Sequence, residues 1–186
     1  MPAGYLSNPA VFLVNALVGA YIFVLILRVL LQLSGASSNN PISAFIIKVT
    51  RHPLNALKPI FPTIKNINLA GVVLIVGLQM LIGFVMLASL PGANSWAIFI
   101  WSVSEVIVQV INVFTYSIFI SIILSWVSPG LHNPVTELLY KITEPILAPC
   151  QRLIPPIGGL DLSPMVALLG LQVLKMLLIP PLQALM

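Results

Sequence analysis

The second half of this chain repeats the first, and that duplication limits the possible folds more than any other feature. Asn-Pro occurs at positions 40–41 and again at 133–134, an offset of 93 in a chain of 186 residues. At the same offset the chain repeats Lys48 as Lys141, Thr50 as Thr143 and Gly77-Leu78-Gln79 as Gly170-Leu171-Gln172. The sequence therefore predicts two copies of one unit, residues 1–93 and 94–186.

The composition places both copies in a membrane. Hydrophobic residues make up 59% of the chain and charged residues only 6%. A soluble domain carries roughly a quarter charged residues, so this chain has too few of them to cover a surface that faces water. Its eight Lys and Arg lie beside apolar stretches, which indicates membrane orientation and headgroup contact, and no direct nucleic-acid contact is expected. The single cysteine, Cys150, excludes an intrachain disulfide and a multi-thiol metal site.

Four apolar stretches are long enough, or nearly so, to cross a bilayer core of about 30 Å as helices. They are residues 10–33, 69–90, 98–127 and 164–179. Ser163 before Pro164 fits an N-cap followed by a first-turn proline, and Pro180-Pro181 fits the end of the fourth span. Asn68 is the corresponding cap candidate in the first copy. We therefore predict an all-α membrane protein with four transmembrane helices in two parallel tandem repeats.

Each copy also has a segment between its spans that is too polar to cross, residues 40–65 and 133–160. Both segments place apolar residues on one helical face: Ile42, Phe45, Ile46 and Val49 in the first, and Val135, Leu138, Leu139 and Ile142 in the second. This pattern predicts an amphipathic helix in the membrane interface. Prolines at 53, 59 and 62, and at 145, 149, 155 and 156, then predict a broken, stiff return to the next span. A shallow re-entrant loop is the alternative.

The distribution of Lys and Arg predicts the orientation. The first hairpin contains Lys48, Arg51, Lys58 and Lys65, and the second contains Lys141 and Arg152, whereas the connector 91–101 and both termini have neither residue type. We therefore expect both hairpins in the cytoplasm and both termini outside. Each copy has an even number of spans, so the copies insert the same way up and are related by an axis along the membrane normal.

Several separated motifs resemble the YggT family of bacterial integral membrane proteins over essentially the whole chain. The second copy carries Asn133-Pro134, Thr143-Glu144-Pro145 and Asp161-Leu162-Ser163-Pro164, which follows Gly158-Gly159. The first copy carries Leu27-Arg28-Val29-Leu30-Leu31-Gln32 and Asn40-Pro41, but it differs at Arg51-His52-Pro53 and at Asn68-Leu69-Ala70-Gly71. The resemblance implies a small multi-pass protein of the bacterial inner membrane. Its family-level role is poorly defined, and relatives are linked to osmotic stress tolerance and ion homeostasis.

Polar residues inside the spans allow structural and functional interpretations. Arg28 is expected either to contact lipid headgroups or a substrate, or to extend its side chain to the membrane interface. Glu105 and Lys175 lie at matching depths in the third and fourth spans, so we expect them to form an ion pair. This pair has either a structural role or a role in a proton relay. Gln79 and Gln172 are equivalent and are predicted to meet across the pseudo-twofold axis, as a mutual amide pair or a midplane substrate site. A polar stripe along the third span lines a channel or serves as packing contacts; it comprises Ser102, Glu105, Gln109, Asn112 and Tyr116.

Taken together, these residues favour a non-enzymatic membrane scaffold or assembly factor, with no cofactor and no metal. The expected partners are anionic lipid headgroups, together with a membrane-protein partner or further copies of this chain in a homo-oligomer. The expected surface for lipid or a partner comprises Arg28, Lys48, Arg51, Lys58, Lys141 and Arg152. The uneven charge of the hairpins suits the first to anionic lipid and the second, which mixes acidic and basic residues, to a partner. The alternative is a small oligomeric ion or osmolyte channel, in which Gln79, Gln109, Asn112 and Gln172 line the path.

Overall fold

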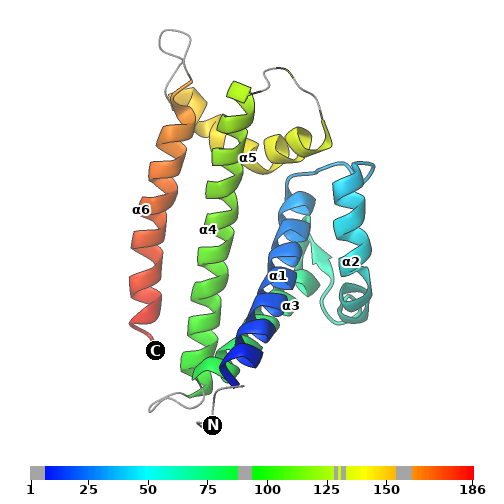
Figure 1. The fold of residues 1–186 in the computed structure, drawn as a ribbon, viewed down its shortest axis with the longest axis vertical. Helices are drawn as coiled ribbons and strands as arrows, with labels where there is room; N and C mark the ends of the chain where they lie inside the picture. The colour runs from blue at the N-terminus through cyan, green and yellow to red at the C-terminus, as the bar shows by residue number, and fades with distance from the viewer. Residues whose placement is uncertain (1–6, 88–93, 128–129, 131–132, 154–160) are drawn as a thin grey trace.

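The computed structural model describes residues 7–87, 94–127, 130, 133–153 and 161–186. Within these residues the fold consists of six helices and one two-stranded ribbon (Figure 1). Four of the helices are long and apolar enough to cross a membrane: α1 (Ser7–Leu33), α3 (Leu69–Leu87), α4 (Ser95–Val127) and α6 (Ser163–Gln183). The predicted all-α architecture with four candidate membrane spans is confirmed.

The helix ends differ from the prediction in one instructive place. Helix α6 was expected to end before Pro180-Pro181, but it continues through both prolines to Gln183. A proline removes one helical hydrogen bond and its ring crowds the carbonyl four residues earlier, but these two prolines lie in the last turn of α6, where few helical bonds depend on them. The Ala184 N–H donates to the Pro180 carbonyl at 3.0 Å, which closes the last turn.

Helix α3 packs against both α1 and α4, and α6 packs against α4 and α5. The largest buried cluster contains Ile22, Leu25 and Ile26 of α1 with Ile75 and Ile82 of α3. Helices α3 and α4 approach closely beside Gly83, because a Cβ atom there would lie 2.9 Å from Ile98 Cγ2. Close van der Waals packing at small residues is the expected means of helix association in a membrane.

The two helices between the spans are α2 (Pro41–Leu57) and α5 (Pro134–Leu153). They begin where the Asn-Pro pairs predict: Asn40 Oδ1 accepts the Ile42 N–H, and Asn133 Oδ1 accepts the Val135 and Thr136 N–H groups. The prediction that the prolines break them was wrong in part. Helix α2 includes Pro53, and α5 includes Pro145 and Pro149. Residues 154–160, with Pro155 and Pro156, lie outside the described residues.

These two helices take different paths. In Figure 1, α2 runs back alongside α1, whereas α5 crosses the end of α4 and reaches α6. Helix α1 begins and α6 ends at one end of the bundle, and α2 and α5 begin beside each other at the opposite end. After α2 the chain forms an antiparallel ribbon of β1 (Thr63–Ile64) and β2 (Ile67–Asn68), which the sequence analysis did not predict.

The starts of α3 and α6 are capped from the same position of each half. Asn68 Oδ1 accepts the Gly71 N–H at 3.0 Å, which confirms the predicted cap. In the second half, the corresponding Asp161 Oδ1 accepts the Ser163 N–H at 2.9 Å. The prediction that Ser163 itself caps α6 was wrong: Leu162 occupies the N-cap, and no side chain makes a capping bond from that position. The aspartate two residues before Ser163 accepts the hydrogen bond of this free amide instead.

Candidate functional site between helices α4 and α5

A hydrogen-bonded junction joins the two halves of the chain where α2 and α5 begin. The Asn40 side chain is buried, and its Nδ2 donates to the Pro134 carbonyl and to Glu137 Oε2, both at 2.9 Å. Its Oδ1 meanwhile caps α2. One amide therefore fixes the start of both helices, and one of its bonds is charge-assisted.

This junction holds the first turns of α5 over a groove between α1 and α2. Leu31 of α1 and Ile46 of α2 form one buried cluster with Leu138 and Ile142 of α5. A small apolar cavity of about 260 Å³ remains among α1, α2, α4 and α5. The groove of the first half is thus covered by a helix from the second half.

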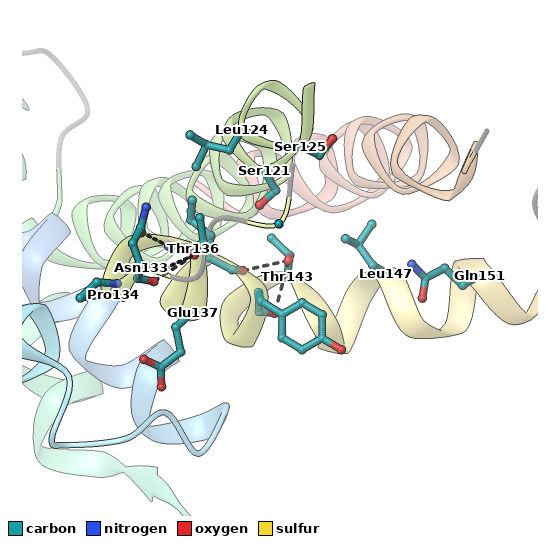
Figure 2. A pocket seen from close by; sticks show the side chains of 13 residues that line it. Ser121, Leu124, Ser125, Asn133, Pro134, Thr136, Glu137, Thr143, Leu147 and Gln151 are labelled. Carbon is teal, nitrogen blue, oxygen red and sulfur yellow. Dashed lines mark hydrogen bonds between the residues drawn. The ribbon is translucent and has the colours of Figure 1, made fainter. Parts of the chain in front are cut away.

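The matching groove of the second half, between α4 and α5, is an open cleft of about 880 Å³. Figure 2 shows Ser121, Leu124 and Ser125 of α4 on one side, and Thr143, Leu147 and Gln151 of α5 on the other. Asn133, Pro134, Thr136 and Glu137 lie at one end (Figure 2). The lining is mainly apolar with a few hydroxyl and amide groups at its edges, the usual composition of a binding cleft.

Side chains at matching positions of the two grooves differ in burial, as expected when one groove is covered and the other is open. Leu31 and Ile46 are buried, whereas their counterparts Leu124 and Leu139 are only partly buried. Thr50 and Thr143 are alike, since both are buried and donate to the carbonyl four residues earlier, at 2.7 and 2.8 Å. The helix geometry is therefore shared, and the covering differs. The sequence analysis missed the cleft, although the repeated Asn-Pro pair marked one end of it.

The amide at the edge of the cleft corresponds to the amide that makes the junction. Asn133 matches Asn40, is exposed, and caps α5 with its Oδ1. Within the described part of the chain its Nδ2 donates to no group. The cleft therefore presents Leu124, Leu139 and the free amide donor of Asn133 at the positions that Leu31, Ile46 and Asn40 occupy in the covered groove.

The predicted basic surface is divided between the two halves. Lys48 and Arg51 of α2 and Lys58, the C-cap of α2, are all exposed. On α5, Lys141 lies 3.5 Å from Glu144, the one ion pair among the described residues, and Arg152 is exposed. Arg28 on α1 is half-buried, and its Nε makes no hydrogen bond. Three of the four exposed cations of the predicted surface outside this ion pair, Lys48, Arg51 and Lys58, therefore lie together in the first half, and the fourth is Arg152.

Two predicted contacts inside the spans are not formed. Gln79 was expected to meet Gln172, but it accepts a hydrogen bond from Gln109 Nε2 at 3.2 Å, and Gln172 is exposed on α6. The reason is that α3 packs on α4, while α6 lies on another side of α4. Glu105 and Lys175 are both half-buried, and neither forms an ion pair in the part of the chain that the structure describes.

The predicted polar stripe of α4 does not face one common space. The Ser102 hydroxyl is buried and donates to the Ile98 carbonyl, and Gln109 is used by Gln79. Tyr116 is exposed, and Asn112 is partly buried. These positions therefore have several different environments. Across the described residues, no group of three or more His, Cys, Asp or Glu side chains is placed to hold a metal ion.

Asp161, at the start of α6, is the titratable group with a resolved shift outside the spans. The Ser163 hydroxyl nearby, the Ser163 N–H and the Gln151 amide lower the pKa of Asp161 below its ordinary value of 3.8, while partial burial opposes them. Gln151 Nε2 donates to Asp161 Oδ2 at 3.0 Å. Since Gln151 also lines the cleft, this contact connects the cleft to the start of α6.

Comparisons with known proteins agree with the duplicated pattern. The sequence model of the CCB3/YggT family matches residues 7–89 and again residues 100–182. The chain is 38% identical over 182 residues to uncharacterized protein PA0392 of Pseudomonas aeruginosa, covering 96% of this chain and 92% of that protein. It is 30% identical over 179 residues to the uncharacterized protein YggT of Escherichia coli K12, covering 95% and 93%. No solved structure matches the chain.

Proposed function

Since the chain belongs to the CCB3/YggT family, we propose that it is a non-enzymatic scaffold or assembly factor of the bacterial inner membrane. The observation that carries this proposal is the open α4–α5 cleft. In this proposal the cleft receives an amphipathic helix of a membrane-protein partner, while the exposed cations of α2 contact anionic lipid headgroups. Helices α2 and α5 face the cytoplasm, because the short Lys- and Arg-containing loops favour that side.

The covered groove of the first half supports a helix as the occupant of the cleft. There, Leu138 and Ile142 of α5 pack against Leu31 and Ile46. Leu124 and Leu139 are the counterparts of Leu31 and Ile46, and they line the open cleft. A partner helix with two apolar residues four positions apart would bury Leu124 and Leu139 in the way that α5 buries the pair in the first half. Apolar burial of this kind is the main driving force where the cleft opens to water.

The free amide of Asn133 supports the same occupant and suggests its polarity. Asn40 donates to a main-chain carbonyl and to a carboxylate in the first turn of α5. Asn133 would bind the first turn of the partner helix in the same way, with an acidic residue near the start of that helix. A carboxylate is also favoured at a helix N-terminus by the helix dipole.

The charge of α2 supports a lipid contact beside this cleft. Lys48, Arg51 and Lys58 are exposed, and a basic residue near an anionic membrane surface contributes about 1 kcal/mol of attraction. Replacing all three by Gln should reduce the anionic phospholipid that copurifies with the protein, as measured by mass spectrometry of extracted lipid. Unchanged lipid content would contradict this part of the proposal.

The role in osmotic stress tolerance is tested with Asn133→Asp. Aspartate still accepts the Val135 and Thr136 N–H groups, so it keeps the cap of α5, but it lacks the amide donor. Expressed in cells without the native gene and shifted to high osmolarity, this variant should fail to restore survival at normal membrane abundance. Survival equal to wild type would contradict the proposal.

The channel alternative makes the opposite prediction. Gln109→Leu and Asn112→Leu remove the polar groups that a channel along α4 would need, and neither group lines the cleft. In our proposal both variants restore survival, provided that immunoblots of the membranes show normal protein levels. Loss of survival with these variants, together with survival of Asn133→Asp, would favour a channel instead.

A further inference from the structure

Helix α6 is covered less by the rest of the molecule than any other candidate span. Only 11% of its most apolar window is buried, compared with 28% for α1, 33% for α3 and 22% for α4. In Figure 1, α6 lies at the edge of the bundle with α4 on one side. Its outer surface is therefore available to lipid or to another protein.

The outer surface of α6 carries a seam with the spacing of a coiled coil. Its residues alternate at steps of four and three: Met165, Leu169, Gln172, Met176, Ile179 and Gln183. Met165, Leu169 and Met176 are 62%, 58% and 72% exposed. Residues at this spacing stay on one side of a helix over its whole length, which is the geometry by which one helix packs along another. We call these six residues the α6 seam.

Gln172 is the residue in the seam that lipid alone does not explain. It lies near the middle of α6 and is exposed. Its counterpart Gln79 is buried and accepts a hydrogen bond from Gln109. An amide in hydrocarbon has no water to bond, so polar residues in spans normally face protein. The exposed amide therefore indicates a missing partner with donor and acceptor groups.

We propose that the α6 seam binds a second copy of this chain, with the two α6 helices parallel about a twofold axis along the membrane normal. In such a contact the same residue of each subunit meets at the axis. Gln172 then lies opposite Gln172 of the partner subunit. Because a carboxamide both donates and accepts, the pair is self-complementary. Gln183 near the end of the seam has the same property.

A head-to-tail contact explains Gln172 less well. Within the chain, α3 and α4 pair Gln79 with Gln109. If α6 of one copy packed on α1 of the next in the same manner, Gln172 would face the position that matches Gln109. That position is Ala16, which has no hydrogen-bonding side chain. A twofold contact satisfies the amide, and a head-to-tail contact leaves it without a partner.

Cysteine crosslinking in native membranes tests the geometry. Cys150 is the single native cysteine, so Cys150→Ala provides a background for Met176→Cys on the seam and Leu177→Cys beside it. The two positions are similarly exposed, at 72% and 66%. Oxidation should give a disulfide-linked dimer with Met176→Cys and little with Leu177→Cys. Absence of a dimer at 176, or equal dimer at both positions, would overturn the proposal.

Co-expression separates the twofold contact from the head-to-tail one. Met176→Cys alone suffices for crosslinking in a twofold dimer. If it crosslinks only when a second copy carrying Ala16→Cys is present, the contact is head-to-tail, and the twofold proposal fails.

The amide itself is tested by Gln172→Leu, with Gln172→Asn as the conservative variant. Dimer affinity, measured by energy transfer between labelled copies at increasing lipid dilution, should fall roughly tenfold with leucine and remain near wild type with asparagine. Gln79→Leu is the matched control, because it should lower thermal stability and leave dimer affinity unchanged. An unchanged affinity for Gln172→Leu would overturn the role of the amide.

Discussion

The two halves of this protein contain matching grooves, but one groove is covered by a helix and the other is open. In the first half α2 runs back along α1, and the first turns of α5 cover Leu31 and Ile46. In the second half α5 crosses to α6, and the groove beside Leu124 and Leu139 stays open. A helix equivalent to α5 would cover it, and within the described residues no helix occupies that place. The duplication therefore leaves one groove covered and one open.

The largest expected difference in stability comes from truncating side chains of the same size at matching positions of the two grooves. Ile46→Ala should lower the free energy of unfolding by about 2–5 kcal/mol, because it leaves a cavity in a buried cluster. Leu139→Ala should cost about 1 kcal/mol or less, because Leu139 faces the cleft and is partly exposed. Thermal and denaturant unfolding of the purified protein measure both. Equal losses would show that the two grooves are equally packed.

A smaller effect is expected at the asparagine pair. Asn40→Asp keeps the cap of α2 but loses the donor to the Pro134 carbonyl and places a carboxylate beside Glu137. Loss of a hydrogen bond to a charged group costs about 1.5–3 kcal/mol, so the unfolding temperature should fall. Asn133→Asp should leave it nearly unchanged, because its amide donates to no described group. A similar fall in both variants would remove the distinction between a used and a free amide.

The smallest effect concerns the caps of the second span in each half. Asp161 has a pKa below its ordinary value of 3.8, so the folded state favours the carboxylate. Its contribution is present above that value and is lost as the pH falls through the lowered pKa. Because Asp161 is exposed, the contribution should be below about 1 kcal/mol. Asp161→Asn should therefore flatten the loss of stability that begins as the pH falls towards 3.8 and continues below it, measured by unfolding at a series of acidic pH values.

The matching control is Asn68, which caps α3 in the first half and does not titrate. Asn68 is buried and its amide donates to Gln32 Oε1 at 3.2 Å, so Asn68→Asp should lower stability at neutral pH and regain part of it as the pH falls. If Asp161→Asn and the native protein unfold identically at every pH, the carboxylate contributes nothing to the start of α6.

The local features of the fold were predictable from the sequence. Apolar length defined the four spans, and Asn40, Asn133 and Asn68 begin helices because their side chains satisfy free amides at the next turn. The prolines were misjudged, since Pro53 and Pro145 lie inside helices. A proline costs a hydrogen bond locally, and packing of the whole helix outweighs that cost when the chain on both sides is held.

The contacts between the halves were not predictable in the same way. Gln79 bonds to Gln109 and not to its own counterpart, because α3 and α6 lie against different sides of α4. The cleft depends on the direction of α5 after Asn133, which tertiary contacts decide. A repeated sequence specifies two similar units, but it does not specify which faces of those units meet.

The most direct test places a photoreactive amino acid at Leu139 and, in a separate variant, at its counterpart Ile46. After irradiation of living cells, the protein with the probe at 139 should form an adduct with another membrane protein. The protein with the probe at 46 should give only crosslinks within its own chain, to α5. If position 139 yields lipid adducts alone, or if both positions give the same products, the open cleft is not a docking site for a partner helix.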